Sequence, residues 1–208
     1  MENSGLRCLQ INLQHSRIAT SNLVQLINEK SIDIAFIQEP YLLNNKLASI
    51  PSTVRKYTAG NMGKRAAILV NNNSIDAITI SQISDGDCVV VQITHRNVTF
   101  FTASMYFDGT KDIEDDIRKI EKIMLHTKGQ GLVILADSNA RNKLWYDIQT
   151  NERGKTLEGF ITMTDLHIIN ENTGGPTFET LNGKSWVDLT MVNNKLLRSI
   201  SEWNAGAE

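Results

Sequence analysis

Residues 131–147 read GLVILADSNARNKLWYD, and this stretch is the most informative about the fold. Residues 132–136 are an apolar run typical of a buried strand, and the run stops at Asp137. Small and polar residues follow, with Asn139 two positions after the carboxylate. The end of a buried strand is a rigid support for reactive side chains, but Asp and Asn also favour turns for conformational reasons alone. Both interpretations of Asp137 stay open on this stretch by itself.

Composition indicates one soluble globular domain. The chain has 208 residues, 41% hydrophobic and 21% charged, with a formal net charge of −2. That balance argues against a strongly basic nucleic-acid-coating protein, although a local cluster of Lys and Arg can still bind DNA. The start MENSGLRC lacks the apolar core of a signal peptide, and no long apolar span is present, so we expect no membrane partner. Cys8 and Cys88 lie in apolar runs and are expected to be buried free thiols.

Hydrophobic periodicity predicts a mixed order of strands and helices. Helical spacing of apolar residues covers 22–30, 113–127 and 156–162. Turn signals at 84–87 and at 181–184 predict two hairpins, and the second is expected to return through a strand at 186–192. The other predicted strands cover 6–13, 33–40, 66–70, 77–83, 88–94, 98–107, 132–137, 167–170 and 177–180. Neighbouring strand pairs rule out a simple doubly wound parallel sheet and favour two packed sheets with helices outside.

Several predicted strands carry a polar group at or near their end. These groups are Asn12, Glu39, Tyr106, Asp137 with Asn139, and Asp188. Each has a structural interpretation, since Tyr106, for example, suits a core aromatic with a bonded hydroxyl. As a set, their oxygen atoms suit Mg²⁺, a second carboxylate can activate a water, and amides and a phenol can hold a phosphate. The set predicts metal-assisted hydrolysis of a phosphoester, and the sequence contains neither a glycine-rich phosphate loop nor a zinc-type Cys/His cluster.

The motifs FIQEP (Glu39), SMYF (Tyr106), ADSNA (Asp137, Asn139) and SWVDLT (Asp188), together with Asn12, resemble those of the endonuclease/exonuclease/phosphatase superfamily. The longer run ADSNARNKLWYD…NERGKTLEGFI…PTFETLNGKSWVDLT is similar to the apurinic-endonuclease-like endonuclease domain of non-LTR (LINE-type) retrotransposons. The resemblance covers nearly the whole chain. It implies an α/β fold, the four-layered α/β/β/α sandwich of DNase I-like proteins, with two mixed sheets packed face to face in a single domain over residues 1–208.

The resemblance also implies an activity. It implies Mg²⁺-dependent nicking of double-stranded DNA, with Mn²⁺ as a substitute, in the nucleus. The 3′-hydroxyl at the nick would prime reverse transcription by a reverse transcriptase domain of the same polyprotein. By position, Glu39 would ligate the metal, and Asp137 would orient or activate the attacking water. Asn12, Tyr106 and Asn139 would hold the scissile phosphate, and Asp188 corresponds to a residue that partners a histidine in the family.

DNA contacts are expected from a hairpin that, in the family, inserts into DNA near the site. Here it maps to residues 180–184, with Thr180, Asn182 and Lys184 as candidates. Arg141 is a candidate for a DNA-backbone contact, and His15 is expected near the site because it closely follows Asn12. An ordinary surface hairpin remains the alternative.

Two departures from the family pattern affect the expected activity. The family ends on a Ser-Asp-His element, and SEWNAGAE stops short of it, so we expect residues 1–208 to lack the final strand and to nick poorly or not at all. Gln14 stands where abasic-site enzymes carry an acid, which favours plain nicking over abasic-site cleavage. Two alternatives stay open. One is another phosphoesterase of the superfamily, such as a lipid or inositol phosphatase or a secreted nuclease. The other is a non-catalytic DNA-binding module of the same fold.

Overall fold

The computed structural model describes residues 5–172, 175–180 and 183–206. The chain folds into two compact units, Met1–Tyr106 and Phe107–Glu208, and each has its own strands and helices. The single domain expected over residues 1–208 stays a prediction.

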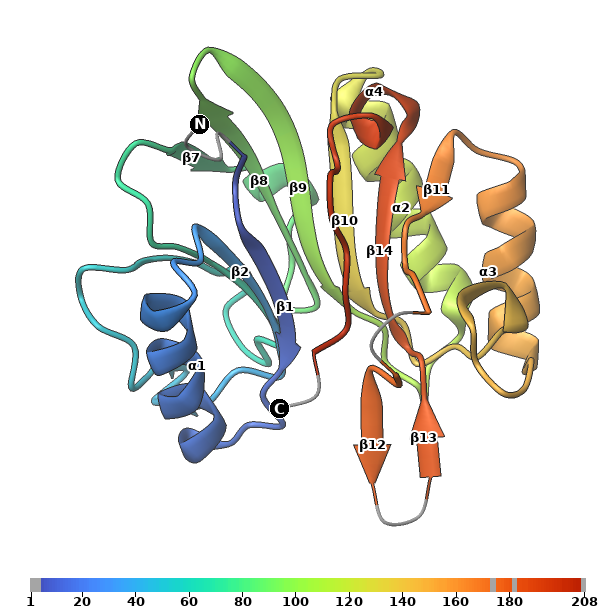
Figure 1. Ribbon diagram of the computed structural model, residues 1–208, viewed down its shortest axis with the longest axis horizontal. Coiled ribbons are helices and arrows are strands. Elements are labelled where there is room, and N and C mark those ends of the chain that lie inside the picture. Colours follow the sequence, from blue (N-terminus) through green and yellow to red (C-terminus); the bar gives the residue numbers. More distant parts are fainter. Residues whose placement is uncertain (1–4, 173–174, 181–182, 207–208) are drawn as a thin grey trace. The chain divides into compact units, whose positions relative to one another are not determined.

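The first unit begins with a mixed four-stranded sheet in the order β1-β2-β6-β5. β1 (Cys8–Asn12) runs parallel to β2 (Ile34–Gln38), so the chain crosses over between them through helix α1 (Arg17–Glu29) (Figure 1). β6 (Ala66–Val70) and β5 (Arg55–Tyr57) complete the sheet in antiparallel pairings. Every residue of β2 and β6 is buried, as expected for the centre of a sheet that is covered on both faces.

A second sheet of the first unit is an antiparallel meander. It consists of β7 (Asp76–Thr79), β8 (Cys88–His95) and β9 (Val98–Tyr106), with the 3₁₀ turn η1 (Ser81–Ile83) between the first two. Buried polar groups join it to the first sheet, because the Gln38 amide donates to Ser104 Oγ at 3.0 Å and this hydroxyl donates to the Ile37 carbonyl at 3.0 Å. Two sheets therefore pack face to face in this unit, as the sequence predicts. A small hairpin, β3 (Leu42–Leu43) and β4 (Lys46–Leu47), lies apart from both sheets.

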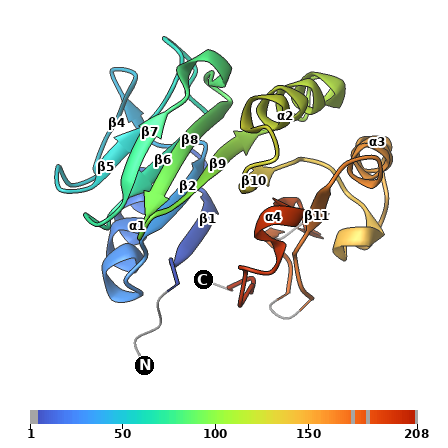
Figure 2. The same cartoon turned by 90° about the horizontal axis from the view of Figure 1, so that it is seen from above.

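The second unit has three antiparallel strands in the order β11-β14-β10. They are β11 (Leu166–Ile168), β14 (Asp188–Asn193) and β10 (Leu132–Asp137). Helices α2 (Ile113–Thr127) and α3 (Glu152–Thr162) lie side by side on one face of these strands (Figure 2). Two short helical segments, η2 (Lys143–Trp145) and α4 (Asn194–Leu197), follow β10 and β14 respectively.

A two-stranded ribbon, β12 (Phe178–Thr180) and β13 (Gly183–Ser185), extends beyond the ends of β10 and β14 (Figure 1). The hairpin is confirmed, but its predicted return through residues 186–192 is wrong, because β13 ends at Ser185 and β14 joins a different sheet. The interruption has a physical cause. The Trp186 amide donates to the Asp147 carboxylate at 3.0 Å, and the Val187 and Asp188 amides donate to Thr177 Oγ1, each at 3.1 Å. These amides are therefore not available to a β12 ladder.

Other differences from the predicted elements have local causes. Helix α1 begins at Arg17 rather than at residue 22, because the Ser16 hydroxyl caps it by accepting from the Ala19 amide. Helix α3 begins at Glu152 rather than at residue 156, after the Asn151 cap. Cys88 is buried as expected, but Cys8, the first residue of β1, is exposed. Within the described ranges, no helix combines the length and apolar character needed to cross a membrane.

Candidate active site

In the first unit, Asn12, His15 and Glu39 come together at the carboxyl ends of two parallel strands. The register pairs Asn12 with Gln38, so the residues that follow both strands share one edge of the sheet. The His15 amide donates to the Glu39 carbonyl at 2.8 Å. Its ring Nε2 lies 3.5 Å from Glu39 Oε1. His15 therefore lies against Glu39, and its place in a reaction site and its contact with DNA stay predictions.

The backbone at this edge is strained. Gln14, His15 and Glu39 have φ angles of 47°, 54° and 47°, a left-handed conformation that few non-glycine residues adopt. The Asn12 side-chain oxygen stabilises the turn by accepting from the Gln14 amide at 2.8 Å. Strained residues of this kind cluster at functional sites, where surrounding contacts hold them in place. The strain thus gives the edge a fixed shape around the Glu39 carboxylate.

Tyr106 ends β9 of the same unit. Its ring lies under the guanidinium of Arg65, with 4.8 Å between the Arg65 Cζ atom and the ring centroid. Its backbone amide donates to the Asp87 carbonyl at 2.8 Å. Tyr106 is half-buried rather than a fully buried core aromatic, which leaves the phosphate-binding interpretation in place as a prediction.

In the second unit, Asp137 and Asp188 stand directly opposite each other on the neighbouring antiparallel strands β10 and β14. Directly opposed residues project from the same face of a sheet, with Cβ atoms about 4.5–5.5 Å apart. Asp137 is 6% exposed. Like charges directly opposite each other destabilise a sheet, so this pair of aspartates lowers the free energy of unfolding. Two carboxylates side by side are instead the arrangement that a reaction centre for water and a phosphate needs.

The loop after Asp137 is held by hydrogen bonds to its backbone. Asn139 has φ 46°, and its side-chain amide donates to the Phe107 carbonyl at 2.9 Å. Arg153, on α3, donates from Nε to the Asn139 carbonyl at 3.1 Å and from Nη2 to the Ser138 carbonyl at 3.3 Å. Arg153 is not among the site residues predicted from the sequence. The structure places Asn139 beside Asp137 and gives the loop a rigid support from α3.

Arg141 is fixed through its backbone rather than its side chain. Its amide donates to Asn151 Oδ1 at 3.1 Å, and its carbonyl accepts from the Asn151 amide at 3.0 Å. Gly154 lies against this carbonyl, because a Cβ built at residue 154 would sit only 1.9 Å from it. The Arg141 side chain is half-buried, and its contact with DNA stays a prediction.

The Asp188 backbone is held from both sides by residues that the sequence analysis did not single out. The Asp188 amide donates to Thr177 Oγ1 at 3.1 Å, and the Asp188 carbonyl accepts from the Asn170 amide side chain at 2.8 Å. Thr177 belongs to the quoted PTF motif, so its position before the ribbon was visible in the sequence, but its acceptor role was not.

Among the DNA-contact candidates of the ribbon, Lys184 is exposed and its Nζ lies 2.8 Å from Glu179 Oε1. Exposed ion pairs contribute little to stability, so a phosphate can compete for this lysine. Thr180 ends β12, and Asn182 lies outside the described residues. Their contacts with DNA stay predictions.

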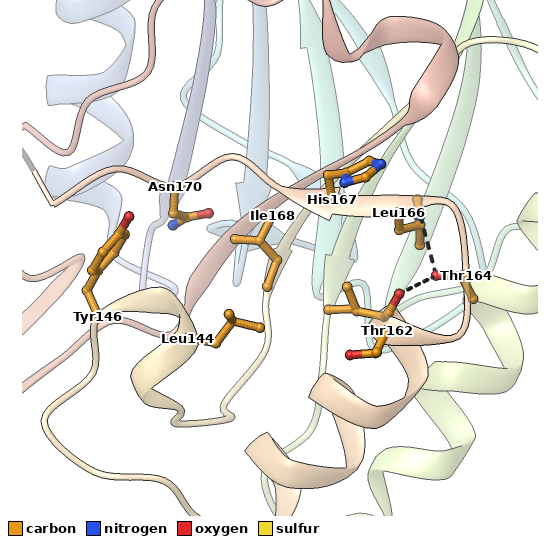
Figure 3. A pocket seen from close by; sticks show the side chains of 9 residues that line it. Leu144, Tyr146, Thr162, Thr164, Leu166, His167, Ile168 and Asn170 are labelled. Atoms are coloured by element: carbon orange, nitrogen blue, oxygen red, sulfur yellow. Dashed lines mark hydrogen bonds between the residues drawn. The ribbon is translucent and has the colours of Figure 1, made fainter.

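A pocket of about 340 Å³ lies in the second unit between η2, the end of α3 and β11 (Figure 3). None of the predicted site residues lines it. Asn170, which lines the pocket, also donates to the Asp188 carbonyl. The lining residues are Leu144, Tyr146, Ile161, Thr162, Thr164, Leu166, His167, Ile168 and Asn170.

Oxygen atoms dominate the donor set at the strand ends. Within residues 5–172, 175–180 and 183–206, no group of three or more His, Cys, Asp or Glu side chains is arranged to hold an ion by itself. Mg²⁺ does not require such a group, since it keeps several waters and binds through one or two carboxylates and the substrate phosphate. The Glu39 carboxylate, at the same sheet edge as Asn12, can supply one such ligand.

Comparisons with known proteins identify the family and the fold of the chain. The sequence profile of the endonuclease–reverse transcriptase family matches residues 100–208, more than half of the chain. The chain belongs to this family. Its fold matches the endonuclease domain of TRAS1, a telomere-specific non-LTR retrotransposon, with a TM-score of 0.86 and 31% identity over 96% of this chain and 90% of that one. The chain is an endonuclease domain of the non-LTR retrotransposon type, and the predicted family is confirmed.

Sequence relatives are retrotransposon proteins. A 115 kDa protein of the type-1 retrotransposable element R1DM of Drosophila melanogaster is 26% identical over 89% of this chain. A retrovirus-related Pol polyprotein of element R1 of Bradysia coprophila is 24% identical over 80% of it. The endonuclease domain spans about a fifth of the length of these relatives, with 19% and 18% covered respectively.

The fold class is also confirmed. An endonuclease/exonuclease/phosphatase family protein from Leptotrichia buccalis shares the fold at 15% identity, with a TM-score of 0.59 over 92% of this chain and 89% of that one. The endonuclease domain is thus an α/β protein of the DNase I-like type, and its enzyme class is that of the nuclease hydrolases in this superfamily.

Proposed function

We propose that this endonuclease domain nicks double-stranded DNA with the help of Mg²⁺ and leaves a 3′-hydroxyl that primes reverse transcription at the target. The observation that carries the proposal is the opposed pair Asp137 and Asp188, with Asn139 on the adjoining loop, in a chain of the endonuclease–reverse transcriptase family.

The chemistry is hydrolysis of a phosphodiester. A water oxygen bonds to phosphorus and loses a proton to the Asp137 carboxylate, which acts as general base. The phosphorus–O3′ bond breaks as the new bond forms, O3′ takes up a proton from solvent water, and Asp137 returns its proton to solvent, so the products are a 3′-hydroxyl and a 5′-phosphate. Asp188 lies directly opposite Asp137 in the sheet. We propose that its carboxylate helps to orient the attacking water toward Asp137.

Charge on the phosphate is offset by donors that the strand ends hold in fixed positions. The Tyr106 hydroxyl and the Asn12 amide of the first unit, and the Asn139 amide of the second unit, would donate to phosphate oxygens, each held by the strand end of its own unit. Glu39, which follows β2 at the sheet edge where β1 ends on Asn12, would hold the divalent cation. When bound, Mg²⁺ neutralises phosphate charge and stabilises the leaving oxygen.

DNA contacts outside the reaction centre come from Lys184 and Thr180 on the ribbon, from Asn182, and from Arg141 and His15. Phosphate contacts of this kind fix the register of a protein on the duplex. The partner is a reverse transcriptase domain of the same polyprotein, a proposal supported by a relative that is named as a Pol polyprotein. Action on chromosomal DNA places the domain in the nucleus.

The experiment is nicking of supercoiled plasmid with Mg²⁺, with and without chelator, followed by extension of the nick with a DNA polymerase. We expect any open-circular product to form only with the metal, and the nick to be extended without prior end repair. DNA binding with no nicking in either condition would contradict the proposal and favour a binding module. Turnover of an inositol phosphate in place of DNA would favour another phosphoesterase.

A further inference from the structure

Arg65 lies directly before β6 and holds a close contact with Asp87. Its Nε and Nη2 atoms donate to the two carboxylate oxygens of Asp87, each at 2.7 Å. The two side chains are only 24% and 17% exposed. A two-point contact between a guanidinium and a carboxylate fixes the plane of the guanidinium as well as its position. The Arg65 side chain is therefore held in one orientation in the first unit.

The Arg65–Asp87 pair supports Tyr106 in two ways. The Arg65 guanidinium lies over the face of the Tyr106 ring, with Cζ 4.8 Å from the centroid, within the range of a cation–π contact. The Tyr106 amide donates to the Asp87 carbonyl at 2.8 Å. One ion pair thus contacts both the ring and the backbone of the tyrosine, which together set where the hydroxyl lies.

The same residue also contacts Glu39. The Arg65 carbonyl accepts from the Glu39 amide at 2.8 Å, and the Arg65 amide donates to the Gly86 carbonyl at 2.6 Å. The segments around Gly63 and Gly86 lie so close together that residue 86 has no room for a side chain, because a Cβ there would lie 2.7 Å from the Gly63 carbonyl oxygen. Both the backbone and the side chain of Arg65 are therefore held in place, and the residue contacts Glu39 and Tyr106.

We infer that Arg65 is a positioning residue for the reaction, which holds the Tyr106 ring and the Glu39 backbone in one arrangement. The inference rests on the proposed DNA-nicking function. Arg65 acts through Tyr106, because its guanidinium is occupied by Asp87 and by the ring face. A lysine cannot replace it, since an ammonium lacks the planar fork that contacts Asp87 at two points.

The test uses Arg65→Met and Arg65→Lys, with Arg55→Met as the matched control. Arg55 is a half-buried arginine of the same unit, and its guanidinium bonds only to backbone carbonyls in the contacts shown, those of Asn72 and Ile75. We expect both Arg65 variants to lower kcat by about 10- to 100-fold with KM for DNA changed by less than about threefold, since small displacements at a reaction centre have effects of that size. Arg55→Met is expected to lower the melting temperature but not kcat, measured well below the melting temperatures of all variants.

A double-mutant cycle with Tyr106→Phe shows whether Arg65 acts through the tyrosine. In the Tyr106→Phe background, Arg65→Met should slow nicking by less than about twofold, because the hydroxyl that Arg65 positions is absent. If the fold-loss in nicking rate of the double variant equals the product of the two single fold-losses, the inference is wrong.

A readout that needs no activity separates this inference from the proposed function. With ¹³C-labelled tyrosine, the Tyr106 resonance, assigned by its loss in Tyr106→Phe, should shift in Arg65→Met and stay in place in Arg55→Met. If the parent domain fails to nick but the resonance shifts as expected, the proposed function is contradicted and the positioning contact stands. If the parent nicks, Arg65→Met nicks at the same rate and the resonance does not move, the inference is wrong.

Discussion

Gly154 gives the sharpest prediction about stability. It lies in the first turn of α3, where a Cβ would meet the Arg141 carbonyl oxygen at 1.9 Å and its carbon at 2.6 Å. Backbone atoms cannot rotate away, so Gly154→Ala must displace the segment that follows the Asp137 loop. Gly159 lies in the same helix with nothing within 4 Å of the equivalent position, which makes Gly159→Ala a matched control.

The two substitutions should change the free energy of unfolding in opposite directions. Alanine in an open helix position is favoured over glycine by about 1 kcal/mol, so Gly159→Ala should raise the melting temperature by roughly 2–4 °C. At Gly154 the same gain is outweighed by overpacking of about 1–3 kcal/mol and by loss of the two Arg141–Asn151 hydrogen bonds at about 1 kcal/mol each. The net loss of about 2–4 kcal/mol should lower the melting temperature by roughly 4–16 °C.

Thermal unfolding of both variants and the parent by calorimetry measures the difference, and plasmid nicking well below the melting temperatures reports on the adjoining loop. We expect Gly154→Ala to nick more slowly and Gly159→Ala to nick at the parent rate. Equal melting temperatures for the two variants would refute the reasoning, because the contact between residue 154 and the Arg141 carbonyl would then not restrict the side chain.

Three further substitutions test the supports of the site. Asn151→Ala removes the acceptor of the Gly154 and Arg141 amides and should lower stability by about 1–2 kcal/mol, measured by urea unfolding; an unchanged unfolding midpoint would contradict the cap. Arg153→Lys replaces a fork that reaches several carbonyls with a single ammonium and should lower kcat about tenfold at an unchanged KM; a change in KM alone would point to a DNA contact instead. Lys184→Gln should change stability by less than about 1 kcal/mol but weaken DNA binding and reduce the salt dependence of log K by about one, measured by anisotropy titration; an unchanged salt slope would exclude a phosphate contact.

Hydrophobic periodicity was sufficient to predict the central elements. The bounds of β6, α2 and β10 match the predicted ranges, because each is an apolar run or an amphipathic stripe bounded by clear turn residues. Residues 80–83 and the return of the hairpin were predicted less well. In both places side-chain acceptors, Ser84 in one and Thr177 in the other, bond backbone amides and interrupt a strand that composition alone favours.

The site residues divide in the same way. Asp137, Asn139 and Glu39 were visible in the sequence because each follows an apolar run that ends abruptly on a polar side chain. Arg153 and Arg65 were not, because Arg153 bonds backbone carbonyls and Arg65 bonds a carboxylate 22 residues away. A carbonyl group is present at every residue, so a sequence does not mark which ones a distant arginine will contact.

The opposed carboxylates of Asp137 and Asp188 are the centre of the account, and plasmid nicking by Asp137→Asn and Asp188→Asn tests them most directly. Asp165→Asn, an exposed aspartate of the same unit, is the control. Relief of the repulsion between like charges should leave the melting temperature of both variants unchanged or higher, while nicking falls by about 10²- to 10⁴-fold. Parent-like nicking by either variant, with the fold intact, would contradict a catalytic role for this pair.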